Sequence, residues 1–181
     1  GCGNGRLAVH AVQFLQQGSY VGIDIAPTFL AHAAQRLAPI QMQSTCAVRL
    51  VHQNDETFDV ADHSVDVACA FSVFTHMEHE DMYRYLVQFT RIVRPGGRLI
   101  ISCLPMTLDV ARQVFRLEAE LDPITRWKRV RNVTTSVDLV NEIVALAGWT
   151  VVRWLPGNEG QAPSSTGEMR ALGQSVVVLT H

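Results

Sequence analysis

Short apolar runs alternate with amphipathic stretches along most of this chain of 181 residues. The apolar runs predict strands at Tyr20–Asp24, Ala47–His52, Val65–Phe71, Arg98–Leu104, Trp149–Leu155 and Ser175–Thr180. The amphipathic stretches predict helices at Leu7–Gln17, Thr28–Ala38, Glu80–Val93, Thr107–Leu121 and, after a capping box at Thr135–Asp138, on to Ala147. Strands that alternate with helices predict an α/β fold, an open sheet covered by helices on both faces.

Prolines and glycines mark where the predicted helices end, and the lack of a helix between the last two strands predicts how those strands pair. Pro27 is expected to open the second helix and Pro39 to end it, while Pro95-Gly96-Gly97 should end the helix that begins at Glu80. The run Val65–Phe71 is almost entirely apolar, which predicts a strand buried on both faces. No helix separates the last two strands, so we expect them to pair antiparallel at the edge of the sheet.

The chain opens on a glycine-rich turn, Gly1-Cys2-Gly3-Asn4-Gly5. Glycines at alternate positions let the backbone turn sharply and approach a ligand closely, because no Cβ intervenes. The turn leads into a predicted helix whose first N–H groups face the loop. Asp24 ends the next strand nineteen positions after Gly5, where a carboxylate can accept hydrogen bonds from ribose hydroxyls. Together these features predict a nucleotide-like cofactor at the carboxyl ends of parallel strands.

Composition narrows the class of protein. The length suits a single domain over residues 1–181, and the formal net charge of −2 gives no electrostatic case for a nucleic-acid or membrane partner. No apolar stretch approaches the roughly 18 residues that a membrane-spanning helix requires. The 4 cysteines lie far apart without a CxxC pair, which predicts reduced thiols in a cytoplasmic protein and no metal site.

Four segments, in order, resemble the motifs of the class I S-adenosylmethionine-dependent methyltransferases, in particular the group of small-molecule methyltransferase domains. They are the turn Gly1–Gly5, the strand Val21–Ile25 with its acid, the strand entry Ala61–Val67, and Arg91–Leu99. The last is the most specific, because it is similar to the family's R-apolar-L-K-P-G-G turn. The third glycine falls one position earlier than in the dinucleotide fingerprint G-x-G-x-x-G.

The resemblance implies a doubly wound, Rossmann-like sheet of seven strands in the order 3-2-1-4-5-7-6, with the seventh antiparallel. A glycine turn of this type normally follows a strand, and no strand precedes Gly1. We therefore expect the first, central strand to lie upstream of Gly1 in a longer natural protein.

The resemblance also implies S-adenosyl-L-methionine as the cofactor and assigns roles to residues. The backbone of Gly1, Cys2, Gly3 and Gly5 would lie against the methionine part. Asp24 would hold the ribose, and Ile25 would flank the adenine ring. The loop Asn54-Asp55-Glu56 would contact the adenine, with the register of these three residues left open. Phe71 and Ser72 would lie near the sulfonium.

His76 is the candidate catalytic residue. In-line methyl transfer to an oxygen, nitrogen or carbon nucleophile requires mainly positioning and exclusion of water, so no obligatory catalytic group is expected. A neutral imidazole just after the fourth expected strand could act as a general base where the acceptor must lose a proton. The alternative is that His76 only caps the following helix or bonds to backbone. His76 and His79 lack a third ligand, so we expect no metal here.

Two later segments are expected to be variable. Residues 105–133 form an insertion or lid, in which Arg126-Trp127-Lys128-Arg129-Val130-Arg131 suits a solvated connector, a substrate lid or an RNA contact. Residues 156–174 form a flexible hairpin loop.

The sequence thus predicts a cytoplasmic methyltransferase with a small-molecule acceptor. The alternatives are a domain that binds the cofactor without turnover, an incomplete domain, and a nicotinamide-dependent oxidoreductase.

Overall fold

Residues 1–15, 17–164 and 166–181 are described in a computed structural model of the protein, and they fall into two units. The first unit is Gly1–Asp55 and the second is Glu56–His181. The expected helix Leu7–Gln17 and the expected loop 156–174 each include one residue outside the described part of the chain, Gln16 and Ser165 respectively.

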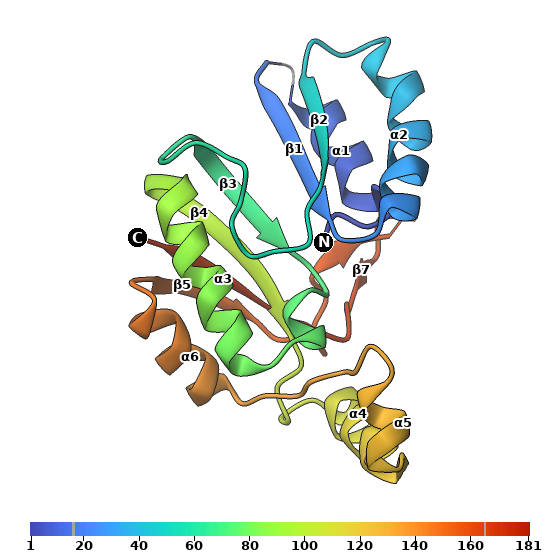
Figure 1. Ribbon diagram of the computed structural model, residues 1–181, viewed down its shortest axis with the longest axis vertical. Coiled ribbons are helices and arrows are strands. Elements are labelled where there is room, and N and C mark those ends of the chain that lie inside the picture. The colour runs from blue at the N-terminus through green and yellow to red at the C-terminus, as the bar shows by residue number, and fades with distance from the viewer. Residues whose placement is uncertain (16, 165) are drawn as a thin grey trace. The chain divides into compact units, whose positions relative to one another are not determined.

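The first unit is a parallel strand pair with two helices (Figure 1). Strands β1 (Ser19–Asp24) and β2 (Ala47–His52) pair in parallel along their whole length. The helices are α1 (Arg6–Phe14) and α2 (Pro27–Gln41). Ala8 and Val12 of α1, Leu37 of α2 and Cys46 form the buried core of this unit. This packing fixes the two helices against the sheet, so the turns that precede them lie at its carboxyl edge.

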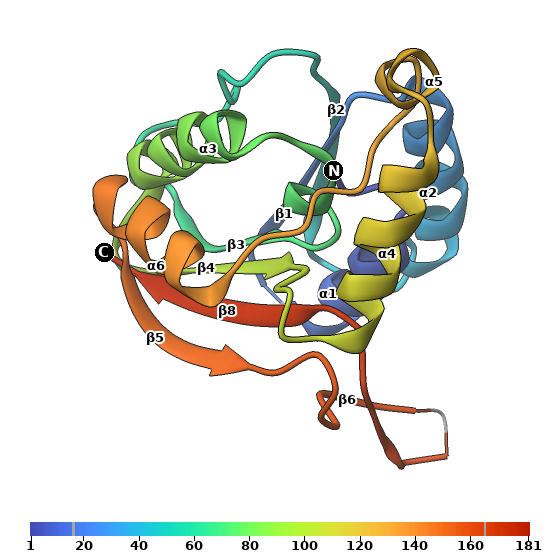
Figure 2. The same ribbon diagram turned by 90° about the horizontal axis from the view of Figure 1, so that it is seen from below.

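The second unit contains a four-stranded mixed sheet in the order β3-β4-β8-β5. Its strands are β3 (Val65–Ala70), β4 (Val93–Cys103), β5 (Thr150–Leu155) and β8 (Ser175–Thr180). Strand β3 pairs in parallel with β4, whereas β8 runs antiparallel to both β4 and β5. Helices α3 (His79–Ile92) and α6 (Val137–Leu146) lie on the same side of this sheet (Figure 2).

Smaller elements complete the second unit. A single 3-10 turn, η1, spans Phe74–His76, and the insertion contains α4 (Asp109–Glu120) and α5 (Pro123–Trp127). The expected loop 156–174 contains a short antiparallel pair, β6 (Ala162–Pro163) with β7 (Met169–Arg170). No helix in the described part of the chain is long and apolar enough to cross a membrane.

Each unit supplies part of the expected strand order. Strands β1 and β2 are the expected second and third strands, and they are neighbours. Strands β3, β4, β5 and β8 correspond to the expected fourth, fifth, sixth and seventh strands, respectively. Their observed order in the sheet, 4-5-7-6, is the predicted order. The antiparallel seventh strand and the α/β fold are therefore confirmed.

Several predicted element boundaries differ from the structure, and three of them differ for clear local reasons. Helix α2 continues through Pro39 to Gln41, because Pro39 lies in the last turn and removes only one intrahelical donor. Val93 is the first residue of β4, where it pairs with Val65, rather than the last residue of α3. The side chain that caps α6 is Ser136, which accepts a hydrogen bond from the Leu139 N–H; Thr135 is not the cap.

The prediction that β3 is buried on both faces is also wrong. Ala68 and Ala70 are buried, but Val67 is 55% exposed and Cys69 is exposed as well. The two pairs point to opposite faces of the sheet, since side chains alternate along a strand. In the second unit α3 and α6 cover one of these faces. An apolar run therefore overstated how much of this strand is buried.

Arg91, in the segment that resembles the R-apolar-L-K-P-G-G turn, anchors a loop. Its guanidinium donates hydrogen bonds to the carbonyl oxygens of Phe58 (2.8 Å) and Val60 (2.9 Å), and it forms an ion pair with Asp62. The loop between β2 and β3 has no regular structure of its own. Arg91 thus replaces the backbone hydrogen bonds that a helix or strand would have supplied.

We predict that Arg91→Ala lowers the free energy of unfolding by about 1–3 kcal/mol, because the Val60 carbonyl loses its guanidinium donor and the Phe58 carbonyl loses one of its two donors. Arg94→Ala is the matched control: its partner Asp66 is 76% exposed, and an exposed ion pair contributes at most about 1 kcal/mol. Urea denaturation of the two variants measures the difference. Equal losses would show that Arg91 does not anchor the loop.

Candidate functional site

The glycine-rich turn is held in a conformation that other residues adopt only at a cost. Gly3 and Gly5 have positive φ angles of 56° and 80°, and Gly5 is the N-cap of α1. A Cβ on Gly5 would lie 3.0 Å from the Cβ of Ala33 and 3.1 Å from its Cα. The turn can therefore pass this close to α2 only as glycine. No side chain caps α1, so its first N–H groups remain available to a ligand.

Asp24 ties this turn to the carboxyl end of β1. One carboxylate oxygen accepts a hydrogen bond from the Gly3 N–H at 2.7 Å, and the other accepts one from the Ala26 N–H at 2.9 Å. The residue is only 6% exposed. Each carboxylate oxygen has a second lone pair, so the group can still accept hydrogen bonds from a diol. The predicted ribose-binding acid is thus also the link between the turn and the strand.

The tips of β1 and β2 are joined by further hydrogen bonds. The Gln53 N–H donates to the Asp24 carbonyl oxygen at 3.1 Å, and His52 Nε2 donates to the Ile25 carbonyl oxygen at 3.0 Å. The side chain of Ile25 is 67% exposed beside them. Asp55 Oδ1 accepts a hydrogen bond from the Gln53 side chain, and Asn54 is exposed. An exposed aliphatic side chain beside polar groups is an arrangement that suits a flat heteroaromatic ring.

In the second unit, Glu56 is committed to another partner. Its carboxylate forms an ion pair with Arg84 of α3. The carboxylate of this candidate for the adenine contact therefore already has a charged side-chain partner. This interaction could not be predicted, since the two residues are far apart in the sequence.

The end of β3 carries Phe71, which is half-buried, and Ser72, which is exposed. Ser72 has a positive φ of 54°, and its N–H donates to Ser102 Oγ at 2.8 Å. Ser102 and the Ser72 hydroxyl both contact the side-chain amide of Gln174. Ser102 and Gln174 were not among the predicted site residues, because neither belongs to a recognisable motif.

His76 is exposed and is oriented by the insertion. Its Nδ1 lies 3.0 Å from the carbonyl oxygen of Arg131. A carbonyl oxygen only accepts, so in the neutral ring Nδ1 carries the proton and Nε2 keeps its lone pair. The nearby Val133 N–H also donates to the Thr75 carbonyl oxygen at 2.7 Å. His76 thus bonds to backbone, as the structural alternative expected, and this bond leaves Nε2 in the form that a general base requires.

The expected insertion, residues 105–133, is organised around Glu118. One oxygen of this buried carboxylate accepts hydrogen bonds from Arg129 and from the backbone and side chain of Asn132. Burial raises the pKa of Glu118, but the Asn132 hydrogen bonds and the charges of Arg129 and Arg126 outweigh it, so the pKa lies below its ordinary value. Glu118 therefore holds α4 to the segment that follows α5.

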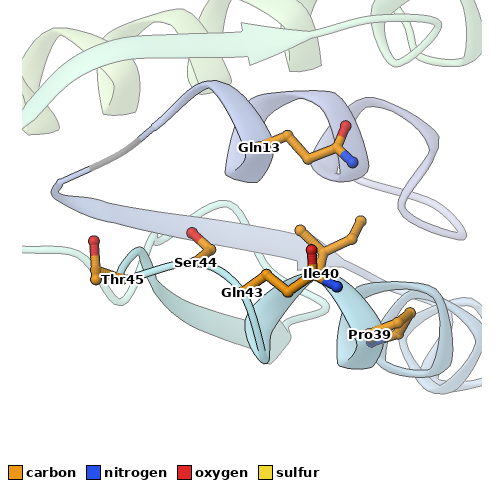
Figure 3. A pocket seen from close by; sticks show the side chains of 6 residues that line it. All are labelled: Gln13, Pro39, Ile40, Gln43, Ser44 and Thr45. Carbon is orange, nitrogen blue, oxygen red and sulfur yellow. The ribbon is translucent and has the colours of Figure 1, made fainter.

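Two hollows lie in the first unit. One, of about 590 Å³, is lined by residues at the carboxyl-terminal ends of α1 and α2: Gln13, Pro39, Ile40, Gln43, Ser44 and Thr45 (Figure 3). It lies at the other end of α1 from the glycine-rich turn and contains none of the predicted residues. The second, of about 330 Å³, includes Asn4 of the turn, with His32, Gln35 and Arg36 of α2.

Among the described residues, no three histidine, cysteine or acidic side chains gather as a metal site.

A model of the methyltransferase domain family matches residues 1–99, just over half of the chain. The chain belongs to this methyltransferase domain family. The match covers the glycine-rich turn, Asp24, the end of β3 and the Pro-Gly-Gly turn of β4. The predicted family is therefore confirmed.

A relative among curated proteins is a tRNA U34 carboxymethyltransferase from Methylococcus capsulatus, 27% identical over 175 residues. The alignment covers 96% of this chain and 49% of the relative, so the chain spans about half the length of that protein.

Solved structures share the fold of this methyltransferase domain. A SAM-dependent methyltransferase from Methanosarcina mazei superposes with a TM-score of 0.71 at 16% identity, over 99% of this chain and 89% of that one. Magnesium protoporphyrin IX methyltransferase from Synechocystis PCC 6803, with bound SAH, gives a TM-score of 0.70 at 17% identity, over 99% and 71% of the two chains. These likenesses confirm the Rossmann-like α/β fold.

We predict that Gly5→Ala destabilises the methyltransferase domain more than Gly3→Ala does. Both substitutions force alanine to a positive φ, which costs about 1–2 kcal/mol, but only the Cβ at position 5 meets Ala33. A Cβ on Gly3 has no heavy atom within 4 Å, which makes this variant the matched control. Urea denaturation measures both losses. If the two variants lose the same free energy, the close approach to α2 is not what requires glycine.

Proposed function

We propose that this protein transfers a methyl group from S-adenosyl-L-methionine to a small-molecule acceptor. Membership of the methyltransferase domain family supports the reaction class. The observation that carries the proposal is the buried carboxylate of Asp24, bonded to the glycine-rich turn at the carboxyl end of β1. This is where the acid of a nucleotide-binding α/β fold meets a ribose.

The residues of the first unit fit the polar parts of this cofactor. We propose that Asp24 accepts hydrogen bonds from the ribose hydroxyls through its remaining lone pairs. The uncapped start of α1 and the backbone of Gly1, Cys2, Gly3 and Gly5 would bind the methionine part, whose carboxylate suits a helix N-terminus. Exposed Ile25 would contact one face of the adenine ring, and Asn54 or Asp55 its polar edge.

In the second unit, we propose that Phe71 and Ser72 contact the part of the cofactor near the sulfonium. The cofactor supplies an activated methyl group, so the protein's task is to position the acceptor in line with it and to exclude water. Where the acceptor must lose a proton, His76 would take it at Nε2, since Nδ1 is bonded to the Arg131 carbonyl oxygen. The insertion, residues 105–133, would act as a lid over the acceptor.

Asp24→Ala should weaken binding of S-adenosylhomocysteine by about 1–3 kcal/mol, because hydrogen bonds to a charged group are lost. Isothermal titration calorimetry measures this, with the exposed residue Asp138 replaced in a control variant, Asp138→Ala. An unchanged dissociation constant in Asp24→Ala would refute the ribose contact. Tight binding of NADH instead of S-adenosylhomocysteine by the wild-type protein would favour the oxidoreductase alternative.

RNA is a second candidate acceptor, because the curated relative is named for an activity on tRNA. The segment Arg126–Arg131 could contact phosphates, and Trp127 is 66% exposed within it. Two of its cations are neutralised, however: Arg129 pairs with Glu118, and Arg131 pairs with Glu78. Such a segment suits a solvated lid better than a phosphate-binding surface, which is why we favour a small molecule.

We also propose a cytoplasmic location, since all four cysteines are free.

The two acceptor classes predict different results when the protein is incubated with bulk tRNA and radiolabelled S-adenosylmethionine. We expect no label in the tRNA at any salt concentration. Incorporation that falls steeply as salt rises, and that falls further in Lys128→Ala, would identify RNA as the acceptor, since phosphate contacts are strongly salt-dependent.

A further inference from the structure

A hydrogen-bond network joins three chain segments at the carboxyl edge of the second sheet. The Ser72 N–H, just after β3, donates to Ser102 Oγ on β4 at 2.8 Å. Ser102 Oγ in turn donates to Gln174 Oε1 at 2.7 Å, just before β8. The Gln174 amide nitrogen returns to Ser72 Oγ at 2.9 Å. The side chain of Gln174 therefore closes a ring of hydrogen bonds around Ser72.

The backbone of Ser72 needs this support. Its φ of 54° lies in the left-handed region, where a residue with a Cβ is strained relative to its ordinary conformation. Ser72 and His63 are the only non-glycine residues with a positive φ in the described part of the chain. Ser102 is only 2% exposed, so removal of either partner would cost its buried hydroxyl one of these two hydrogen bonds.

The direction of the chain after β3 depends on this one residue. The left-handed turn at Ser72 ends the strand and leads into η1, which presents His76 four residues later. Strained backbone that the surrounding structure holds in place is concentrated at functional sites. Both Phe71 and His76, on either side of Ser72, are candidates for contact with cofactor or acceptor.

We propose that Gln174 is a positioning residue of the methyltransferase site: through Ser72 and Ser102 it fixes the left-handed turn that directs the segment Phe71–His76. This inference rests on the proposed function. Gln174 does not need to touch cofactor or acceptor itself. Its side chain reaches Ser72 and Ser102 at the same time, which a shorter side chain from the start of β8 does not.

The test compares five variants of the whole protein by two measurements. Hydrogen–deuterium exchange reports the protection of the peptide spanning residues 71–76, and calorimetry reports the dissociation constant for S-adenosylhomocysteine. We expect Gln174→Ala to lose protection in this peptide and to bind roughly three- to tenfold more weakly. Ser102→Ala, which removes the acceptor of the Ser72 N–H, should reproduce both effects. Gln41→Ala, at the exposed end of α2, should change neither.

Gln174→Asn separates positioning from simple packing. Gln174→Asn keeps the amide but shortens the side chain by one methylene, so it should behave like Gln174→Ala. Gln174→Glu keeps the full length and still accepts hydrogen bonds from both serine hydroxyls, so it should retain most of the protection. Thermal unfolding confirms that each variant is folded. If Gln174→Ala does not fold, Ser102→Ala tests the same hydrogen-bond network.

The results distinguish this inference from the proposed function. If the wild-type protein does not bind S-adenosylhomocysteine, the proposed function fails, and exchange alone still tests whether Gln174 holds the turn. If the wild type binds and Gln174→Ala binds equally well with unchanged exchange, the positioning role is overturned. Retention of full protection in Gln174→Asn would overturn it as well.

Discussion

Strand pairing is the constraint on which the placement of the candidate residues depends. Strands β1 and β2 pair residue for residue up to Asp24 and His52, so Asp24 and the segment after His52 leave the sheet at the same edge. In the second unit β3 and β4 end together, and the antiparallel β8 begins where they end. Residues distant in sequence therefore meet at one edge: Ser72 and Gln174 are 102 positions apart and share two hydrogen-bonding contacts.

Elements whose signal is local were predicted well from the sequence. Ala47–His52 and Ser175–Thr180 have the predicted bounds. The glycine-rich turn and Asp24 were identified because a close backbone approach and a strand-end acid leave a pattern in the sequence itself. That the Asp24 carboxylate accepts from the Gly3 and Ala26 N–H groups was not predictable, since it depends on the conformation of the turn.

Two failures have different causes, one set by distant parts of the chain and one by position within a helix. Val67 is apolar and exposed because burial depends on what covers a face of the sheet, which hydrophobicity alone does not specify. Pro39 was expected to end α2, yet it costs one hydrogen bond near a helix end that would fray in any case. For Val67 the tertiary environment outweighed the local rule, whereas for Pro39 the end of the helix tolerated a residue that its interior would not.

The insertion illustrates how such distant contacts tie candidate chemistry to the fold. A connector that only spanned α4 and α6 would need no partner near His76. Instead, Arg131 pairs with Glu78, its guanidinium lies 4.2 Å above the Trp127 ring, and its carbonyl oxygen accepts the His76 Nδ1 proton. The side chain of Arg131 fixes the position of its own carbonyl oxygen through these interactions. The tautomer of His76 therefore depends on the conformation of the insertion. A movement of residues 105–133 that displaced Arg131 would therefore also remove the partner that orients His76.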